Sequence, residues 1–167
     1  LGLTAPTTIE ADAPPLDDQI WTPRSTVAYE FPGTERTAGD KLPLTWRDGK
    51  GHMPKREQLG LPDDYELPHA GSVLLGEQGT MVIPHYAMPV LFPKEKFTEF
   101  KMPELGEVNH YTSWVDACLG DGQTSSHFGY AGPLTEAVLL GVVAIRFPKE
   151  QFQWDAKAGE IAHNADA

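Results

Sequence analysis

Histidine has the widest chemical repertoire of the residues in this chain, and the sequence holds six, at positions 52, 69, 85, 110, 127 and 163. No two of them stand four residues apart, as on one helix face, or two apart, as on one strand face. A metal site would need ligands converging from distant segments, so the sequence predicts no bound metal. His110 and His127 stand near expected helix starts, where capping or loop hydrogen bonding accounts for them.

Other catalytic signatures are also missing from the sequence. It contains no Gly-x-Ser-x-Gly elbow, Walker loop, His-Glu-x-x-His motif or EF-hand loop. The adjacent carboxylates 17–18 and 63–64 are interpreted as solvated charges, because neighbouring side chains point apart. Residues 120–125 (GDGQTS) approach a dinucleotide-binding loop, but such a loop must follow a strand and open a helix. Here a helix is expected before the glycines, so these residues are predicted to cap it.

Charge and composition restrict the partners. The chain has 13 Lys and Arg against 24 Asp and Glu, a net charge of −11, so a phosphate backbone would be repelled and no nucleic acid is expected. The longest apolar run, residues 137–147, is shorter than the ~20 residues of a membrane span, so no membrane is expected. The sequence begins at Leu1 without a signal-peptide pattern. We expect a piece of a longer protein and leave its localisation open.

The first part of the chain has the patterns of β-strands. Alternation at Val27, Tyr29 and Phe31 predicts a strand over 25–31, and alternation at Leu42, Leu44 and Trp46 predicts its antiparallel neighbour over 42–46. Further strands are expected at 7–11, 72–76, 80–83 and 90–92, with a hairpin between the second and third of these. Residues 50–70 are rich in proline, glycine and charge, and we expect a long surface loop there.

Helices are expected in the second part. Five apolar residues form one helical stripe between a cap at Asn109 and a stop at Gly120: Tyr111, Trp114, Val115, Cys118 and Leu119. Cys118, the single cysteine, is therefore expected to be buried, and no internal disulfide can form. A second helix is predicted over 133–146, with Pro133 at its first position. Trp46, Trp114 and most of this second helix are expected in the core.

A last short strand is predicted at 152–154, and the polar residues after Asp155 are expected to fray. Strands followed by helices, without strand–helix alternation, indicate an α+β fold: a mostly antiparallel open sheet with helices packed on one face. We predict one domain over residues 1–160 and a flexible tail over 161–167.

Four segments resemble the C-terminal domain of Gfo/Idh/MocA oxidoreductases. Leu44–Gly49 (LTWRDG) is similar to a strand end written LTWYDGG in bacterial members, and Gly71–Thr80 (GSVLLGEQGT) to the hairpin GSLFIGEKGT. Phe128–Gly141 (FGYAGPLTEAVLLG) resembles FDYAGPLTEVVLLG, the most specific of these matches. Gln153–Ala156 (QWDA) resembles part of the closing EWDAE. The likeness extends over about residues 5 to 160.

The resemblance implies a function that this chain only partly contains. Such enzymes oxidise or reduce sugars, inositols or related polyols by hydride transfer to or from NAD or NADP. Their cofactor loop and catalytic lysine lie in an N-terminal Rossmann domain, which is absent here. The resemblance therefore implies no catalytic and no cofactor-binding residue in this chain, and an inactive fragment. It implies a domain that shapes the substrate cleft and forms a homo-oligomer through an exposed sheet face.

Substrate contacts are the sites that the resemblance implies here. They lie in three segments: the strand end, the segment after the hairpin, and the loop at 125–130. The residues are Trp46, Asp48, His85, Tyr86, His127 and Tyr130. Hydroxyl, imidazole and aromatic groups suit a polyol, whereas ordinary loop structure is the alternative for each residue.

Two other classes of protein stay open on the sequence. One is a non-catalytic module that binds carbohydrate or partner subunits. The other is a metal-free hydrolase or isomerase, which the lack of a paired nucleophile and base disfavours. A preceding domain with a strand, a glycine-rich loop and a helix would favour the oxidoreductase.

Overall fold

The computed structural model describes residues 1–17, 19–49, 53–106 and 108–162. It confirms the α+β class, with two antiparallel sheets and two α-helices among the described residues. The chain divides into two compact units. The five-stranded unit comprises Leu1–His52 and Gly106–Ala167, and the three-stranded unit comprises Met53–Leu105. The predicted strands are therefore distributed over two sheets, each described below by itself.

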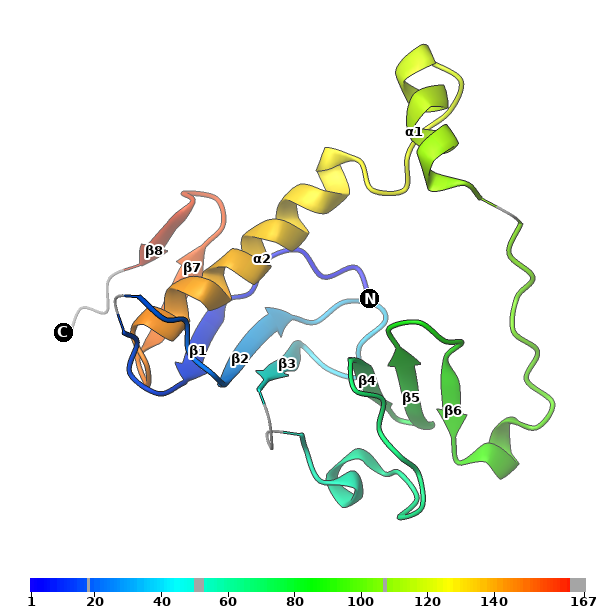
Figure 1. Ribbon diagram of the computed structural model, residues 1–167, viewed down its shortest axis with the longest axis horizontal. Coiled ribbons are helices and arrows are strands. Elements are labelled where there is room, and N and C mark those ends of the chain that lie inside the picture. The colour runs from blue at the N-terminus through cyan, green and yellow to red at the C-terminus, as the bar shows by residue number, and fades with distance from the viewer. Residues whose placement is uncertain (18, 50–52, 107, 163–167) are drawn as a thin grey trace. The chain divides into compact units, whose positions relative to one another are not determined.

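The sheet of the five-stranded unit has the order β3-β2-β1-β7-β8, and every neighbouring pair is antiparallel (Figure 1). Its strands are β1 (Thr8–Asp12), β2 (Ser25–Pro32), β3 (Lys41–Asp48), β7 (Gln151–Asp155) and β8 (Glu160–Ala162). Segments from near the two ends of the chain thus lie side by side at the centre of the sheet, where β1 pairs with β7. The strands predicted at 7–11, 25–31, 42–46 and 152–154 are all present, each slightly longer or shifted by one residue.

Strand register gives this sheet two different faces. Tyr29 is paired with Ile9 on one side and with Leu44 on the other, so these three side chains share a face. Ile9 and Tyr29 are buried there, together with Val27, Phe31 and Ala11. The opposite face carries mainly polar or charged side chains such as Glu10 and Thr45. One apolar face and one solvated face is the expected pattern for an antiparallel sheet covered on one side.

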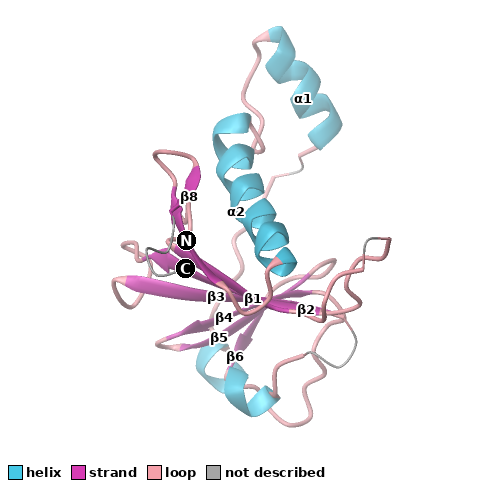
Figure 2. Cartoon of the chain, turned by 90° about the vertical axis from the view of Figure 1, so that its left-hand side faces the viewer, coloured by secondary structure: helices cyan, strands magenta, loops and turns pink. Residues whose placement is uncertain are grey.

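Helix α2 (Phe128–Arg146) covers the apolar face. It buries four residues of its C-terminal half: Leu140, Gly141, Ala144 and Ile145. Figure 2 shows α2 on one side of β1 and β2. A second link comes from the indole Nε1 of Trp154 in β7, which donates a hydrogen bond of 2.9 Å to Glu136 Oε1. The helix is thus held through its small residues over β1 and β2 and through one polar contact over β7.

Gly141 is the point of closest approach between helix and sheet. A Cβ atom at this position would overlap the hydroxyl of Tyr29 and lie 3.0 Å from its Cζ. Tyr29 is itself buried in the same core. Only a residue without a side chain lets α2 approach the sheet this closely.

The three-stranded unit has a small core of its own. Its sheet, in the order β4-β5-β6, consists of β4 (Gly71–Gly76), β5 (Gly79–Pro84) and β6 (Val90–Phe92). The hairpin predicted between 76 and 79 is present, and the strand at 90–92 has the predicted bounds. Two 3₁₀ turns accompany the strands, at Arg56–Leu59 and Lys94–Phe97. Val82 and Phe92 are buried together with Leu59 and Leu61.

The described part of the predicted surface loop over 50–70 is largely exposed and contains no strand and no α-helix, but two of its residues belong to this core. Within the described part of this segment, from residue 53 onward, Leu59 and Leu61 are buried and the Thr80 hydroxyl donates a hydrogen bond to the Leu59 carbonyl at 2.7 Å. The segment carries too few apolar residues to show a helical or strand period. Tyr65 and Leu67 of the same segment pack against this core as well.

The first helix, α1 (His110–Leu119), confirms the predicted caps. The Asn109 side chain accepts hydrogen bonds from the backbone N–H groups of Tyr111 and Thr112, and Gly120 ends the helix at φ 89°. Its predicted burial is wrong, because α1 has no buried residue and Trp114 is 63% exposed. Cys118 is exposed as well. The periodicity correctly identified an amphipathic helix but could not specify what covers its apolar side.

Two further predictions about boundaries are wrong. Helix α2 begins at Phe128, so Pro133 lies inside it and not at its first position. A proline removes one intrahelical hydrogen bond and crowds the carbonyl four residues before it, but the helix nevertheless extends N-terminally to Phe128. The residues after Asp155 were predicted to fray. They instead form a hairpin, in which Ile161 of β8 pairs with Trp154 of β7. Residues 163–167 of the predicted tail lie outside the described residues.

The expected core position of Trp46 is also wrong, since this side chain is 53% exposed. Trp46 shares a face with the buried Val27, but β3 is the outermost strand of its sheet. Helix α2 contacts β1 and β2, and β3 lies beyond them. A strand pattern marks the apolar face correctly without indicating how far the covering helix reaches.

By length and composition, α2 is the one helix among the described residues that could cross a membrane. Core helices of water-soluble domains meet the same criterion, and α2 packs through four buried residues on a sheet. The feature by itself does not assign a membrane, and the expectation of no membrane contact stays a prediction.

We predict that Gly141→Ala lowers the free energy of unfolding by about 1–2 kcal/mol. The overlap with Tyr29 outweighs the ~1 kcal/mol that alanine gains over glycine in a helix. Urea unfolding followed by circular dichroism measures the change. Gly129→Ala is the control, because its Cβ would meet only the exposed His127 ring, and it should leave stability equal or higher. Equal effects of the two substitutions would contradict the close contact.

We predict that stability falls at alkaline pH through Tyr29. Burial raises the pKa of this phenol above its ordinary value of 10.0. The folded protein therefore retains the phenolic proton at pH values where the unfolded chain loses it. The stabilisation is complete below pH ~10 and is lost as pH rises through the folded-state pKa. Urea midpoints measured between pH 8 and 11 should show this fall, and Tyr29→Phe should flatten it.

Candidate functional site

The six candidate substrate contacts lie at three separate places. Trp46 and Asp48 end β3, and His127 and Tyr130 stand at the start of α2, all in the five-stranded unit. His85 and Tyr86 follow β5 in the three-stranded unit. Within the described part of the five-stranded unit, no hydrogen bond or ring contact joins the β3 pair to the α2 pair. Each pair is described below by itself.

Asp48 has a structural role at the end of β3. Its Oδ1 accepts hydrogen bonds from both the backbone N–H of Ser25 at 2.9 Å and the Ser25 hydroxyl at 3.0 Å. Ser25 is fully buried, so these two donors have no access to water. Gly49, at φ 88°, then turns the chain where a side chain would collide with Pro23 and Arg24. One oxygen of Asp48 is committed to the fold, and its carboxylate is otherwise exposed.

His127 directly precedes α2, and Tyr130 lies in its first turn. His127 is the N-cap residue, but its side chain makes no capping hydrogen bond; its carbonyl accepts from the N–H groups of Tyr130 and Ala131, both at 2.9 Å. Helix N-caps are usually Ser, Thr, Asp or Asn, so an imidazole here does not have the ordinary capping function. Tyr130 is 57% exposed. Both side chains are open to a ligand or to another domain.

His85 and Tyr86 form an exposed pair of rings. Their centroids are 4.5 Å apart with the planes inclined by 49°, and Tyr86 is 96% exposed. The His85 N–H donates to the Ala70 carbonyl at 3.0 Å, which anchors the backbone beside the hairpin. An anchored backbone with free rings is suitable for stacking on a sugar, although neither ring is enclosed.

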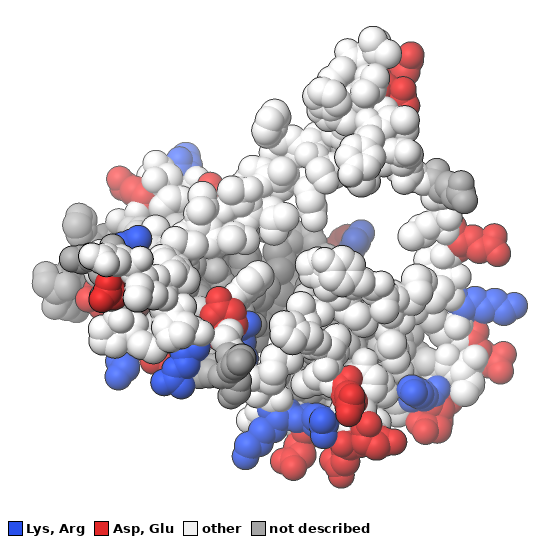
Figure 3. Space-filling model, viewed as in Figure 1, with Lys and Arg blue, Asp and Glu red and all other residues white. Residues whose placement is uncertain are grey.

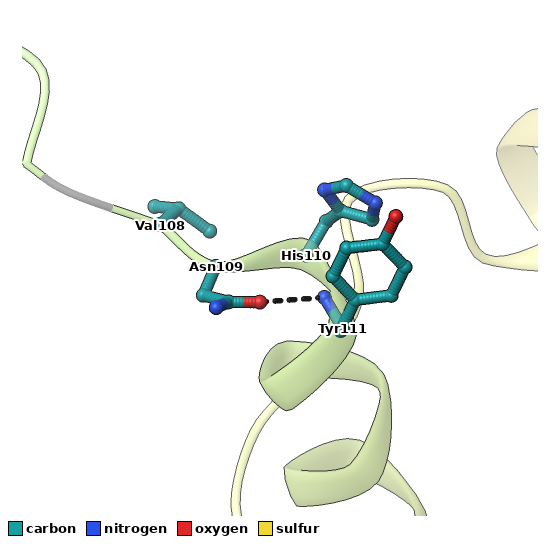
Figure 4. A pocket seen from close by; sticks show the side chains of 4 residues that line it. All are labelled: Val108, Asn109, His110 and Tyr111. Carbon is teal, nitrogen blue, oxygen red and sulfur yellow. Dashed lines mark hydrogen bonds between the residues drawn. The ribbon is translucent and has the colours of Figure 1, made fainter.

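Two shallow depressions on the described part of the chain contain none of these six residues. One lies at the start of α1 and is lined by Val108, Asn109, His110 and Tyr111 (Figure 4). The His110 and Tyr111 rings lie 4.0 Å apart there. The other lies in the three-stranded unit, between 53–57 and 63–67, where the Arg56 guanidinium donates to the Asp63 carbonyl. Neither depression encloses a small molecule on most sides, as ligand pockets normally do.

The described residues contain no group of three or more histidine, cysteine or carboxylate side chains that could hold a metal ion. Residues 120–125 follow α1 and close it, with Gly120 in the left-handed conformation, so they do not form a pyrophosphate loop. The sequence indicates His110 as a residue at a helix start. No motif or periodicity in the sequence indicates that Val108 or residues 53–67 line a depression.

Helix α2 presents a broad apolar surface on the side away from the sheet. Val138, Leu139, Val142 and Val143 are between 36% and 55% exposed. The only charged residues of α2 are Glu136 and Arg146, and Figure 3 shows the surface over this helix almost free of charged atoms. A helix that is apolar on nearly every side is normally covered on more than one.

No family model matches this chain, and no curated protein sequence is significantly similar to it.

We predict that Asp48→Ala lowers the free energy of unfolding by about 1–3 kcal/mol, because the buried Ser25 donors lose their acceptor. Asp48→Asn keeps an acceptor oxygen and should cost less. Asp40→Ala, at an exposed position, is the matched control and should change stability by no more than about 0.5 kcal/mol. Denaturant unfolding of the three variants tests this. A loss for Asp48→Ala no larger than the control's would show that the carboxylate is free for another role.

Proposed function

We propose that this chain is the C-terminal domain of a Gfo/Idh/MocA-type NAD(P)-dependent oxidoreductase, which shapes the substrate cleft for a sugar, inositol or related polyol. The observation that carries the proposal is the uncovered apolar side of α2, formed by Val138, Leu139, Val142 and Val143. A water-soluble domain rarely leaves a continuous apolar surface of this kind exposed, and such surfaces mark contacts with another domain or subunit. The N-terminal Rossmann domain of the same enzyme fits that requirement.

The segments that resemble the family coincide with elements of the structure. Leu44–Gly49 forms the end of β3 and its turn, Gly71–Thr80 forms the β4–β5 hairpin, and Phe128–Gly141 forms most of α2. Gln153–Ala156 spans the end of β7, where Trp154 reaches Glu136 of α2. Trp154 and Glu136 both belong to resembling segments, so the resemblance includes a pair in direct contact.

The division of roles within the proposed enzyme follows from what this chain holds. NAD or NADP would bind to the N-terminal domain and accept or donate the hydride, since no described loop here both follows a strand and opens a helix with the required glycines. This chain would contribute exposed hydrogen-bonding and stacking groups, among them Trp46, His127 and Tyr130. Such groups orient a polyol without taking part in bond breaking.

The proposed homo-oligomer would use the solvated face of the five-stranded sheet. Across its centre the register places Glu10, Ala28 and Thr45 in one row, and all three are exposed. Small and polar side chains of this kind allow two flat sheets to approach with hydrogen bonds across the contact. The face is more polar than an obligate interface usually is.

The test is calorimetric titration of NAD(H) and NADP(H) into two proteins: a longer one that includes the N-terminal domain, and this 167-residue chain. We expect binding by the longer protein only, and polyol-dependent reduction of the nicotinamide by that protein only. Cofactor binding or turnover by this chain alone would overturn the division of roles. Binding by neither protein would favour the non-catalytic carbohydrate- or partner-binding module.

A further inference from the structure

The sheet-facing stripe of α2 continues beyond the part of the helix that the sheet covers. Tyr130, Leu134, Ala137 and Gly141 follow one another at spacings of four, three and four residues, so they lie on one side of the helix. Gly141 is buried and Ala137 packs against the same core. Leu134 and Tyr130, one and two turns further toward the N-terminus, are 52% and 57% exposed. The side of α2 that contacts the sheet thus continues toward the N-terminus as an exposed apolar surface.

Helix α1 carries a matching apolar stripe. Tyr111, Trp114, Val115 and Leu119 are exposed by 74%, 63%, 46% and 73%. The helix contains one Asp and no Glu, Lys or Arg, and this residue, Asp116, lies on the opposite side from the stripe. Aromatic side chains bury roughly 150–250 Å² each in a core, so Tyr111, Trp114 and Tyr130 together leave a large apolar area in water.

The connection between the two helices has the length of an antiparallel helical hairpin. Residues 120–127 join Leu119 to Phe128, and helices packed as antiparallel neighbours are usually joined by 2–8 residues. Gly120 and Gly122 adopt φ values of 89° and 141°, which give this connection backbone freedom that other residues lack. The ten residues of α1 span about 15 Å, the length of the first ten residues of α2.

In the structure α1 has no buried residue. We propose that it closes antiparallel onto the N-terminal half of α2 as a second arrangement, on the side of Tyr130 and Leu134, and that this closed arrangement predominates in solution and extends the core of the five-stranded unit. In this arrangement Leu119 faces Tyr130, and Val115 with Trp114 faces Leu134. The outer side of α2, with Leu139 and Val143, stays free for another domain. The inference is independent of the oxidoreductase proposal, since it concerns contacts within this chain alone.

Cys118 provides the readout, because it lies within the α1 stripe and is the single cysteine of the chain. In the structure its side chain is exposed. Packing of α1 on α2 would cover it, so its reaction with Ellman's reagent should be at least tenfold slower in the folded 167-residue chain than in the same chain unfolded in urea. The rate should not change when the protein is diluted, because the covering helix belongs to the same molecule.

Leu134→Asp should restore fast labelling, and Tyr130→Asp is a second variant for the same contact. Both positions are more than half exposed without α1, so circular dichroism should show the fold retained. Leu139→Asp is the matched control: a leucine of similar exposure on the outer side of α2, whose replacement should leave Cys118 protected. Fast labelling of the unsubstituted chain would overturn the proposal. Protection that disappears on dilution, or that Leu139→Asp abolishes equally, would also overturn it.

Discussion

The contact between Gly141 and Tyr29 determines how the five-stranded unit is built. Because the glycine has no side chain, the backbone of α2 rests directly on a buried phenol, and the neighbouring Ala144 and Ile145 reach the sheet on either side. Tyr29 in turn depends on its register with Ile9 and Leu44, which aligns β1, β2 and β3, and α2 covers the first two of these strands. The strand register therefore positions the phenol, and the close approach at Gly141 positions α2 on it.

The same contact explains why α2 is covered on one side only. Packing at Gly141 holds the C-terminal half of the helix on β1 and β2, whereas the Trp154–Glu136 hydrogen bond secures it over β7. Residues N-terminal to Glu136 then extend past these attachments, and the outer side has no neighbour in the sheet. A 19-residue helix with a nearly uniform apolar surface needs more cover than one sheet supplies. The surplus apolar surface is the physical basis for expecting a second domain on one side and α1 on another.

Much of this fold could be predicted from periodicity, because strand faces and helix caps are encoded by neighbouring residues. Alternation at Val27, Tyr29 and Phe31 identified the central strand, and Asn109 and Gly120 identified both ends of α1. The predictions that were wrong concern contacts between elements that are distant in the sequence. Burial of Trp46 and Trp114 depends on which element covers them, and neither period nor propensity carries that information. Proline disfavours a helix interior, so Pro133 indicated a helix start at that position, whereas α2 extends five residues further to Phe128.

The candidate site was less predictable than the fold for a related reason. A resemblance places residues by position in the chain, whereas a site requires side chains to converge. Within the described part of the five-stranded unit, no hydrogen bond or ring contact joins the β3 pair (Trp46 and Asp48) to the α2 pair (His127 and Tyr130). Asp48 illustrates the difference. Its sequence neighbours suggest a strand end open to ligands, but the β2–β3 register brings it beside Ser25, whose buried N–H and hydroxyl both need an acceptor. A carboxylate that satisfies two buried donors is restrained in position, and that restraint also fixes the direction in which its second oxygen and the following Gly49 turn face the solvent. Asp48 therefore belongs both to the fold and to the candidate site. The hydrogen bonds that hold the end of β3 would also orient any substrate group that donates a hydrogen bond to the second carboxylate oxygen.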